Sequence, residues 1–183
     1  MAFALRLARG IDALNERIAR LAAWLVLAAV VISAGNAISR KAFSLSSNAW
    51  LELQWYLFGA VFLLGASWTL KRNEHVRIDV LSSRFSQRAR DRLDLAGHAL
   101  FLIPFAVVHV ITAVPFFLLS WRTGEVSANA GGLPLWPAKL LVLVGFAMLT
   151  AQALSELVKK IAVLRGALPP EEPGAPPGSG LSA

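Results

Sequence analysis

The sequence predicts an all-α membrane protein with four transmembrane helices, an amphipathic N-terminal helix at the membrane interface, and both termini in the cytoplasm. Three observations support this prediction. Only 16% of the 183 residues are charged, whereas a soluble domain usually contains about 25%. The mean hydropathy is +0.59, and the apolar residues gather in four long segments. Basic residues flank these segments unevenly, which is the pattern that orients membrane helices.

The first unit, residues 1–20, has the pattern of an amphipathic helix. Charged residues lie mostly between its apolar residues. The apolar residues recur at intervals of three and four: Leu7, Ile11, Leu14, Ile18 and the following Leu21. Such a helix suits the membrane interface, where its cations approach anionic headgroups. A plain helical lead-in to the first span is the alternative.

Four predicted spans follow, within a transmembrane domain of residues 21–160. They cover about residues 21–40, 49–70, 94–121 and 137–158. The first apolar run is too extended, and its lead-in too long, for a cleaved signal peptide. In the second span, small residues favour close helix packing: Gly59, Ala60, Gly65 and Ala66.

The third span is longer than a bilayer requires. Residues 95–121 contain no Asp, Glu, Lys or Arg, and at 1.5 Å per residue they extend roughly 40 Å. This span must therefore tilt, kink or protrude, and Pro104 and Pro115 are candidate kinks. The connection at residues 122–137 is rich in Gly and Pro, which predicts a shaped loop rather than a helix. Residues 161–183, rich in Pro and Gly, are predicted to form a disordered cytoplasmic tail.

Charge predicts the orientation of the chain. With four spans, the N-terminal segment, the basic loop at residues 71–94 and the C-terminal flank share one side, which holds fourteen of the 18 lysines and arginines. The other side holds Arg40, Lys41, Arg122 and Lys139. The excess of positive charge places both termini in the cytoplasm.

Several function classes find no support in the sequence. There is no cysteine, no hydrolase or metalloprotease motif, and no nucleotide-binding lysine motif, so we expect no enzyme, no metal and no cofactor. His98 and His109 share a helical face, but His75 lies in a loop, so a haem would lack facing ligands. We expect the two intramembrane histidines to hydrogen-bond to neighbouring helices or to a partner. The basic residues form no face with interleaved aromatics, so nucleic acid is not an expected partner. Without interrupted spans in matching halves, an accessory or scaffold subunit is more plausible than a carrier.

Two motifs stand in order in the chain. The first joins a Glu at the start of the second span to a Gly-Ala pair and a basic turn: Glu52, Gly65, Ala66, His75, Val76, Arg77, Ile78 and Asp79. The second is a Gly-Leu-Pro-x-Trp-Pro turn that opens the last span, with residues Gly124, Glu125, Ser127, Gly132, Leu133, Pro134, Trp136, Pro137 and Lys139. Together, over about residues 21–160, they resemble the small integral-membrane (DctQ-like) subunit of tripartite ATP-independent periplasmic (TRAP) transporters.

The resemblance implies a scaffold subunit in a bacterial inner membrane. Such transporters import organic acids or related solutes with a sodium gradient. A periplasmic solute-binding protein captures the solute, and a large membrane subunit carries the solute and sodium sites. The candidate partner contacts are Glu52, His75, Arg77, Asp79, Glu125, Ser127, Pro134, Trp136 and Lys139.

Each group of candidates has a simpler interpretation. Glu52 is either a solvated interfacial acid, an acceptor at its own helix N-terminus, or a functional contact. His75, Arg77 and Asp79 form either a charge network after the second span or a plain topology anchor. Glu125, Ser127 and Trp136 either contact a partner or sit in a turn fixed by Gly and Pro. Two alternatives for the whole chain are an assembly or regulatory subunit of another membrane complex, and a haem- or quinone-binding anchor.

Overall fold

The computed structural model describes residues 2–45, 47–72 and 86–169, and the regular structure in these ranges is helical apart from one isolated β-bridge. The long helices are α1 (Ala2–Phe43), α2 (Asn48–Lys71), α5 (Ile103–Thr123) and α6 (Trp136–Leu164). A shorter helix, α4 (Gln87–Gly97), leads into α5 through a π-helical turn, η1 (His98–Leu102). Within the described ranges, four helical rods, with α4, η1 and α5 counted as one, are long and apolar enough to cross a membrane. The predicted all-α class with four membrane-length helices is therefore confirmed.

The first predicted unit and the first predicted span are one helix. α1 contains 42 residues without a break at residue 20. At 1.5 Å per residue it is about 63 Å long, roughly twice the thickness of a hydrocarbon core. Part of α1 must therefore lie outside the core or run at a strong tilt.

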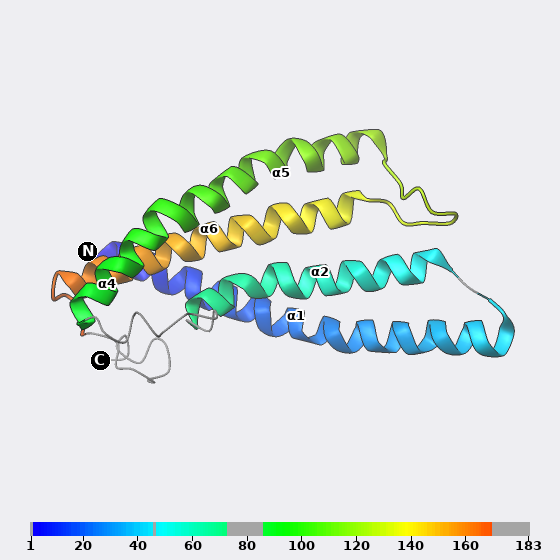
Figure 1. The fold of residues 1–183 in the computed structure, drawn as a ribbon, viewed down its shortest axis with the longest axis horizontal. Helices are drawn as coiled ribbons and strands as arrows, with labels where there is room; N and C mark the ends of the chain where they lie inside the picture. The colour runs from blue at the N-terminus through cyan, green and yellow to red at the C-terminus, as the bar shows by residue number, and fades with distance from the viewer. Residues whose placement is uncertain (1, 46, 73–85, 170–183) are drawn as a thin grey trace.

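The helices pack mainly as a layer. Figure 1 shows them at one end of the molecule in the order α1, α2, α6, α5, with the loop from α1 to α2 and the connection from α5 to α6 at that end. α2 packs on α1 and on α6, α5 packs on α6, and α1 also contacts α6. At the opposite end the first half of α1 crosses α6, near α4 and the N-terminus (Figure 1).

A glycine sets the closest approach between α2 and α6. A Cβ added at Gly145 on α6 would lie 2.7 Å from the Cβ of Leu63 on α2, which is closer than packed side chains allow. On α2, Ala60 is buried, but the positions a Cβ would take at Gly59 and Gly65 are open. The close packing expected from the small residues of the second span therefore depends on Gly145 of the fourth.

The rod formed by α4, η1 and α5 curves over α6 (Figure 1). In η1 the backbone N–H of Ile103 bonds to the carbonyl of His98, five residues earlier. The next residue is Pro104, at the start of α5, which has no N–H to donate. The irregularity predicted near Pro104 is thus a π-helical turn, whereas α5 continues through Pro115.

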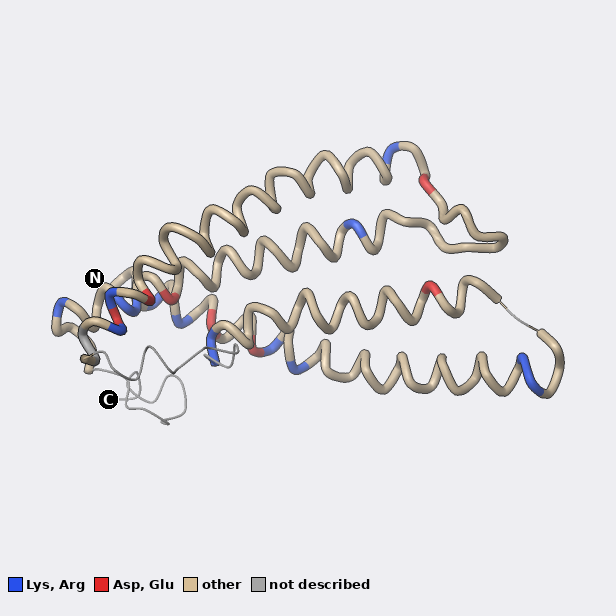
Figure 2. The backbone as a smooth tube through the Cα atoms, viewed as in Figure 1, with Lys and Arg blue, Asp and Glu red and all other residues tan. Residues whose placement is uncertain are grey.

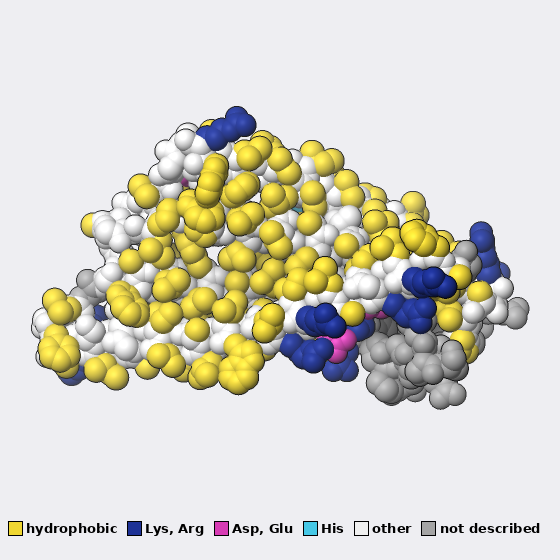
Figure 3. Space-filling view, turned by 180° about the vertical axis from the view of Figure 1, so that it is seen from behind, with side chains coloured by type: hydrophobic (Ala, Val, Ile, Leu, Met, Phe, Trp, Pro, Cys, Tyr) yellow, Lys and Arg dark blue, Asp and Glu magenta, His cyan; other side chains and the backbone are white. Residues whose placement is uncertain are grey.

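In Figure 2, most of the charged residues lie toward the end of the molecule that holds the N-terminus. Long stretches of the helices contain no charged residue. The outside of the helices is apolar over wide areas (Figure 3). Large side chains such as Phe62 and Phe101 are 77% and 74% exposed, as helices in contact with lipid require. α6 continues to Leu164, beyond residue 160, where the transmembrane domain is predicted to end. Of the predicted disordered tail, residues 170–183 lie outside the described residues.

Candidate functional site at the connector

The connector, defined here as residues 124–135 between α5 and α6, folds into a small hairpin. Gly124 ends α5 with a left-handed backbone (φ 61°), and its N–H bonds to the carbonyl of Ser120. The N–H of Ser127 bonds to the carbonyl of Leu133 at 2.9 Å, and the N–H of Leu135 to that of Glu125 at 2.9 Å. The predicted shaped loop is therefore confirmed for residues 124–135, whereas residues 122–123 and 136–137 of the predicted loop belong to α5 and α6.

The tip of the hairpin has no room for a side chain at one position. The N–H of Gly132 bonds to the carbonyl of Asn129 at 2.9 Å. A Cβ at Gly132 would lie 2.6 Å from the Cβ of Ser127 and 3.0 Å from the carbonyl oxygen of Asn129. Gly131 has a φ of 69°, which favours glycine for a different reason, its backbone conformation.

The carboxylate of Glu52 holds the connector. Glu52 lies near the start of α2 and is only 3% exposed, because the connector covers it. One oxygen accepts hydrogen bonds from the hydroxyl of Ser127 and, at 2.8 Å, from the side-chain amide of Asn129. The other accepts the backbone N–H of Leu133 at 2.7 Å. Hydrogen bonds to an ionised acceptor are stronger than neutral ones, so this group, the Glu52 clasp, ties the hairpin to α2.

Two further residues of α2 extend the clasp. The side-chain amide of Asn48 donates to the carbonyl of Ala130 at 3.0 Å. The hydroxyl of Tyr56 donates to the carbonyl of Pro134 at 3.1 Å. Asn48, Glu52 and Tyr56 are spaced by four residues, so they lie on one face of α2. One helical face thus contacts the connector from its tip to its return toward α6.

An ion pair and an aromatic contact hold the other side of the connector. Glu125 accepts a hydrogen bond from the ammonium of Lys139, on the first turn of α6. This hydrogen bond lowers the pKa of the Glu125 carboxyl below its ordinary value. The Lys139 ammonium also lies 4.1 Å from the ring centre of Phe116 on α5. Trp121 and Trp136 meet edge to face, with ring centroids 4.8 Å apart.

The structure brings together six of the nine predicted contact residues at this end of the molecule: Glu52, Glu125, Ser127, Pro134, Trp136 and Lys139. His75, Arg77 and Asp79 lie outside the described residues. Two interpretations of Glu52 are wrong. It is not a solvated interfacial acid, and its three donors come from the connector rather than from the first turn of α2.

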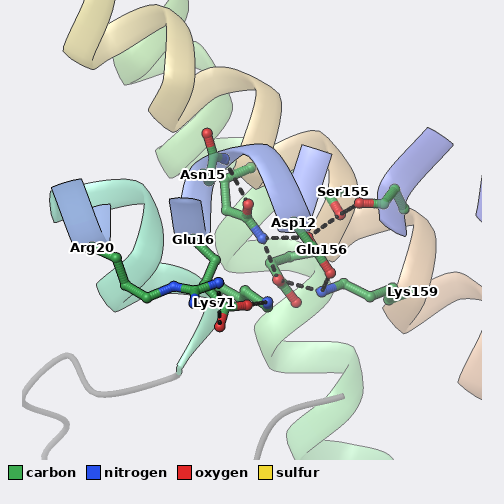
Figure 4. Close-up of polar contacts among 10 residues, drawn as sticks. Asp12, Asn15, Glu16, Arg20, Lys71, Ser155, Glu156 and Lys159 are labelled. Atoms are coloured by element: carbon green, nitrogen blue, oxygen red, sulfur yellow. Dashed lines mark hydrogen bonds and ion pairs between the residues drawn. The ribbon is translucent and has the colours of Figure 1, made fainter. Parts of the chain in front are cut away.

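A second polar group, the α1–α6 network, lies at the opposite end of the molecule and was not predicted. Figure 4 shows Asp12 and Asn15 of α1 facing Ser155, Glu156 and Lys159 of α6. The ammonium of Lys159 lies 3.0 Å from Asp12 and 2.6 Å from Glu156. These three side chains are 14% exposed or less.

Gln152 of α6 lies at the centre of this network. Its amide nitrogen donates to Asp12 and to Glu156, each at 2.8 Å. Its oxygen accepts the amide of Asn15 at 2.8 Å, and Ser155 donates to Asp12 at 2.9 Å. The buried charges are thus paired and hydrogen-bonded, as burial requires.

Outer ion pairs surround the network. Lys71 of α2 pairs with Glu16 of α1 at 2.8 Å, and Lys160 of α6 with Asp91 of α4 at 3.3 Å. Each joins a different helix to the crossing of α1 and α6. The sequence contains a signal for this network, because polar residues recur at helical spacing in both α1 and α6. Which helical faces meet, however, depends on how the two helices cross.

One ring nitrogen of each intramembrane histidine faces a carbonyl of its own helical rod. The Nδ1 atom of His98 lies 2.6 Å from the carbonyl of Asp94, and that of His109 lies 2.8 Å from the carbonyl of Phe105. Both contacts are within the same helical rod rather than with a neighbouring helix. His109 also stacks on Phe146 of α6, with ring centroids 4.4 Å apart.

The fold and the clasp define a class of protein, a multi-pass helical membrane protein. Most of the polar side chains described above form hydrogen bonds or ion pairs with other parts of the same chain. A family model described as "Tripartite ATP-independent periplasmic transporters, DctQ component" matches residues 29–163. The chain therefore belongs to this family, the small permease component of TRAP transporters, which is a transporter component rather than an enzyme family. Comparison with curated proteins and with solved structures found no match.

Proposed function

We propose that this chain is the fixed scaffold subunit of a sodium-coupled TRAP-type transporter in a bacterial inner membrane. It packs against a large membrane subunit, which carries the solute and sodium sites, and works with a periplasmic solute-binding protein. The solutes are organic acids or related compounds. The observation that carries this proposal, beside family membership, is the Glu52 clasp, which gives the connector a fixed shape at one end of the bundle.

The engaged polar groups support a structural rather than a solute-binding role. The carboxylate of Glu52 has three donors from the connector. Asp12 and Glu156 share the Lys159 ammonium and the Gln152 amide. A carboxylate with so many internal partners is poorly placed to bind a sodium ion or a solute as well. Sodium binding is accordingly assigned to the large subunit.

The geometry divides the predicted contact residues into two roles. Glu52 and Ser127 face each other inside the clasp, so they position the connector rather than contact a partner. Val126, which is 60% exposed, and the exposed Ala128 and Ala130 present its outer surface. We assign the contact with the binding protein to this outer surface.

The proposed orientation places the connector in the periplasm. Of the 16 lysines and arginines that the structure describes, twelve belong to the segments at the opposite end, which favours a cytoplasmic location for that end. Reporter fusions at Gly131 and after residue 169 test this orientation. We expect a periplasmic signal at Gly131 and a cytoplasmic signal at the C-terminus, and the reverse would contradict the proposal.

Co-purification tests the proposed function. The tagged chain is isolated from native membranes in mild detergent, and the proteins that accompany it are identified by mass spectrometry. We expect a large multi-span protein at about one to one, and sodium-dependent solute uptake after reconstitution with the binding protein. Recovery of the folded chain alone would instead favour an assembly or regulatory role.

A matched pair of variants tests the outer surface. Val126→Asp should lower uptake without lowering co-purification of the large subunit. Leu45→Asp is the control, because Leu45 is also an exposed apolar residue, at 65%, in the other connection at the same end. If the two variants lower uptake equally, the contact with the binding protein cannot be assigned to the connector.

A further inference from the structure

The first half of α1 displays three different sectors around its axis. We call residues 2–22 of α1 the N-terminal arm. Its inner sector contains the buried residues Ala8, Asp12, Asn15, Ala19 and Ala22. The other two sectors face outward and differ sharply in chemistry.

One outward sector is cationic. Arg6, Arg9, Arg17 and Arg20, defined here as the arginine stripe, are all exposed. At 100° per residue the four positions fall within about 80° around the helix axis. They extend over roughly 21 Å along it, at 1.5 Å per residue. Figure 3 shows cationic side chains from the middle of the molecule toward one end, beside a wide apolar surface.

The other outward sector is apolar. Leu7, Leu14 and Leu21 are 58%, 57% and 70% exposed, and their spacing of seven residues places them on one side of the arm. They stand at the same levels along the helix as the arginines. Side chains of this kind cost free energy in water, whereas an interfacial helix buries them among acyl chains and keeps its cations at the headgroups.

The arm cannot swing away from the bundle without breaking buried contacts. Asp12 bonds to Gln152, Ser155 and Lys159 of α6, and Glu16 pairs with Lys71 of α2. These contacts fix the rotation of the arm about its axis. The arginine stripe therefore has a set direction relative to the four membrane-length helices.

The described part of the chain leaves most of the stripe without an acidic partner. Arg20 lies 3.7 Å from Glu16, and no ion pair joins Arg6, Arg9 or Arg17 to any described residue. A guanidinium offers donors in a fork that matches two oxygens of one phosphate. The adjoining leucines favour a ligand that brings acyl chains with the phosphate.

We propose that the arginine stripe binds the phosphate groups of anionic phospholipids in the leaflet that surrounds the arm. The leucine sector lies among the acyl chains of the same lipids, and the α1–α6 network holds both sectors in place. This binding goes beyond the proposed transport function and needs no partner subunit.

Native mass spectrometry tests the proposal on the full chain. The detergent-solubilised protein is mixed with equal amounts of phosphatidylglycerol and phosphatidylcholine of the same acyl chains, and the retained lipids are counted. We expect the wild-type chain to retain phosphatidylglycerol preferentially. In an R6Q/R9Q/R17Q variant, the ratio of retained phosphatidylglycerol to phosphatidylcholine should fall about fivefold or more. One arginine near an anionic surface contributes about this factor.

The control variant removes three cations elsewhere. R40Q/K41Q/R122Q loses the same charge from the opposite end of the bundle, and it should keep the wild-type preference. An R6K/R9K/R17K variant preserves charge and should keep most of the preference, which guards against a folding defect in the glutamine variant. Circular dichroism compares the folding of all three.

Three outcomes would overturn the proposal: no preference for phosphatidylglycerol in the wild type, equal losses in the two glutamine variants, or an unchanged preference in R6Q/R9Q/R17Q. If that variant keeps its lipids but no longer co-purifies with the large membrane subunit, the stripe is a protein-docking surface instead. A negative result in the lipid-retention measurement leaves the proposed function untouched, because that measurement contains no other subunit.

Discussion

The carboxylate of Glu52 on α2 accepts a hydrogen bond from the backbone N–H of Leu133 at 2.7 Å, across 81 residues of sequence. The connector follows α5 and precedes α6, yet its tip is held by neither of these helices. The shape of the connector therefore depends on the packing of α2 against α6. A change in that packing alters the connector even when no connector residue is changed.

Replacing Glu52 by Gln should loosen the connector. The variant removes the charge that three donors share and places an amide nitrogen among them, which leaves at least one donor without an acceptor. We expect limited proteolysis to cut the connector about tenfold faster, because cleavage reports local opening. Glu16→Gln is the control at the opposite end, and it should leave the cleavage rate within about twofold. Equal rates in wild type and Glu52→Gln would refute the clasp.

Replacing Gly132 by Ala should destabilise the hairpin by about 1–3 kcal/mol. The new Cβ would lie 2.6 Å from the Cβ of Ser127, so Ser127 must shift away from Glu52. The measurement is the free energy of unfolding in mixed micelles. As a control, Gly59→Ala adds a Cβ in open space on a helix and should stabilise the protein by about 0.5–1 kcal/mol. Gly132→Ala at wild-type stability would show that the hairpin is not tightly packed.

Replacing Lys159 by Met should cost about 3–5 kcal/mol of unfolding free energy, since it leaves two buried carboxylates without their cation. Asp12 and Glu156 have side chains only 8% and 11% exposed. Lys71→Met is the matched control. Its partner Glu16 is 39% exposed, so water compensates and the loss should stay within about 1 kcal/mol. Similar losses in the two variants would contradict the distinction between buried and exposed pairs.

The Glu125–Lys139 pair predicts a dependence on pH. The hydrogen bond that Lys139 donates to the Glu125 carboxylate holds the pKa of Glu125 below its ordinary value of 4.5. Because the folded pKa is lowered, the stabilisation is fully present above the ordinary value and is lost as the pH falls through the folded pKa. Titration of the Glu125 carboxyl carbon by NMR measures this pKa directly. In Lys139→Met the pKa should rise toward 4.5, and an unchanged pKa would exclude Lys139 as the cause.

The membrane-length helices and the shaped connector were predictable because each depends on a local signal. Apolar length predicts a span, and Gly and Pro predict a turn. Glu52 was a candidate because a carboxylate beside a span is costly without a partner. Its partners Asn129 and Leu133 were not predictable, because contacts across about 80 residues depend on which helices become neighbours.

The N-terminal arm shows a second limit of sequence reasoning. Its apolar stripe, which includes Leu7 and Leu14, is conspicuous in the sequence, and in a soluble protein it would be the packed face. Here the packed face contains Asp12 and Asn15. Where lipid is as apolar as leucine, helix contacts favour small and polar groups instead. These residues are helical, but as part of one helix with the first span, and the pattern did not show which face packs.

The path of α1 has a mechanical consequence. Its second half lies along α2, and its first half crosses α6 at the far end (Figure 1). It thus acts as a diagonal brace, since any sliding of α2 past α6 would break the contacts of α1 with both. A braced frame resists shear, so the four helices should respond to an outside force as one stiff plate. A partner that changes shape beside such a plate would move against a surface that holds still.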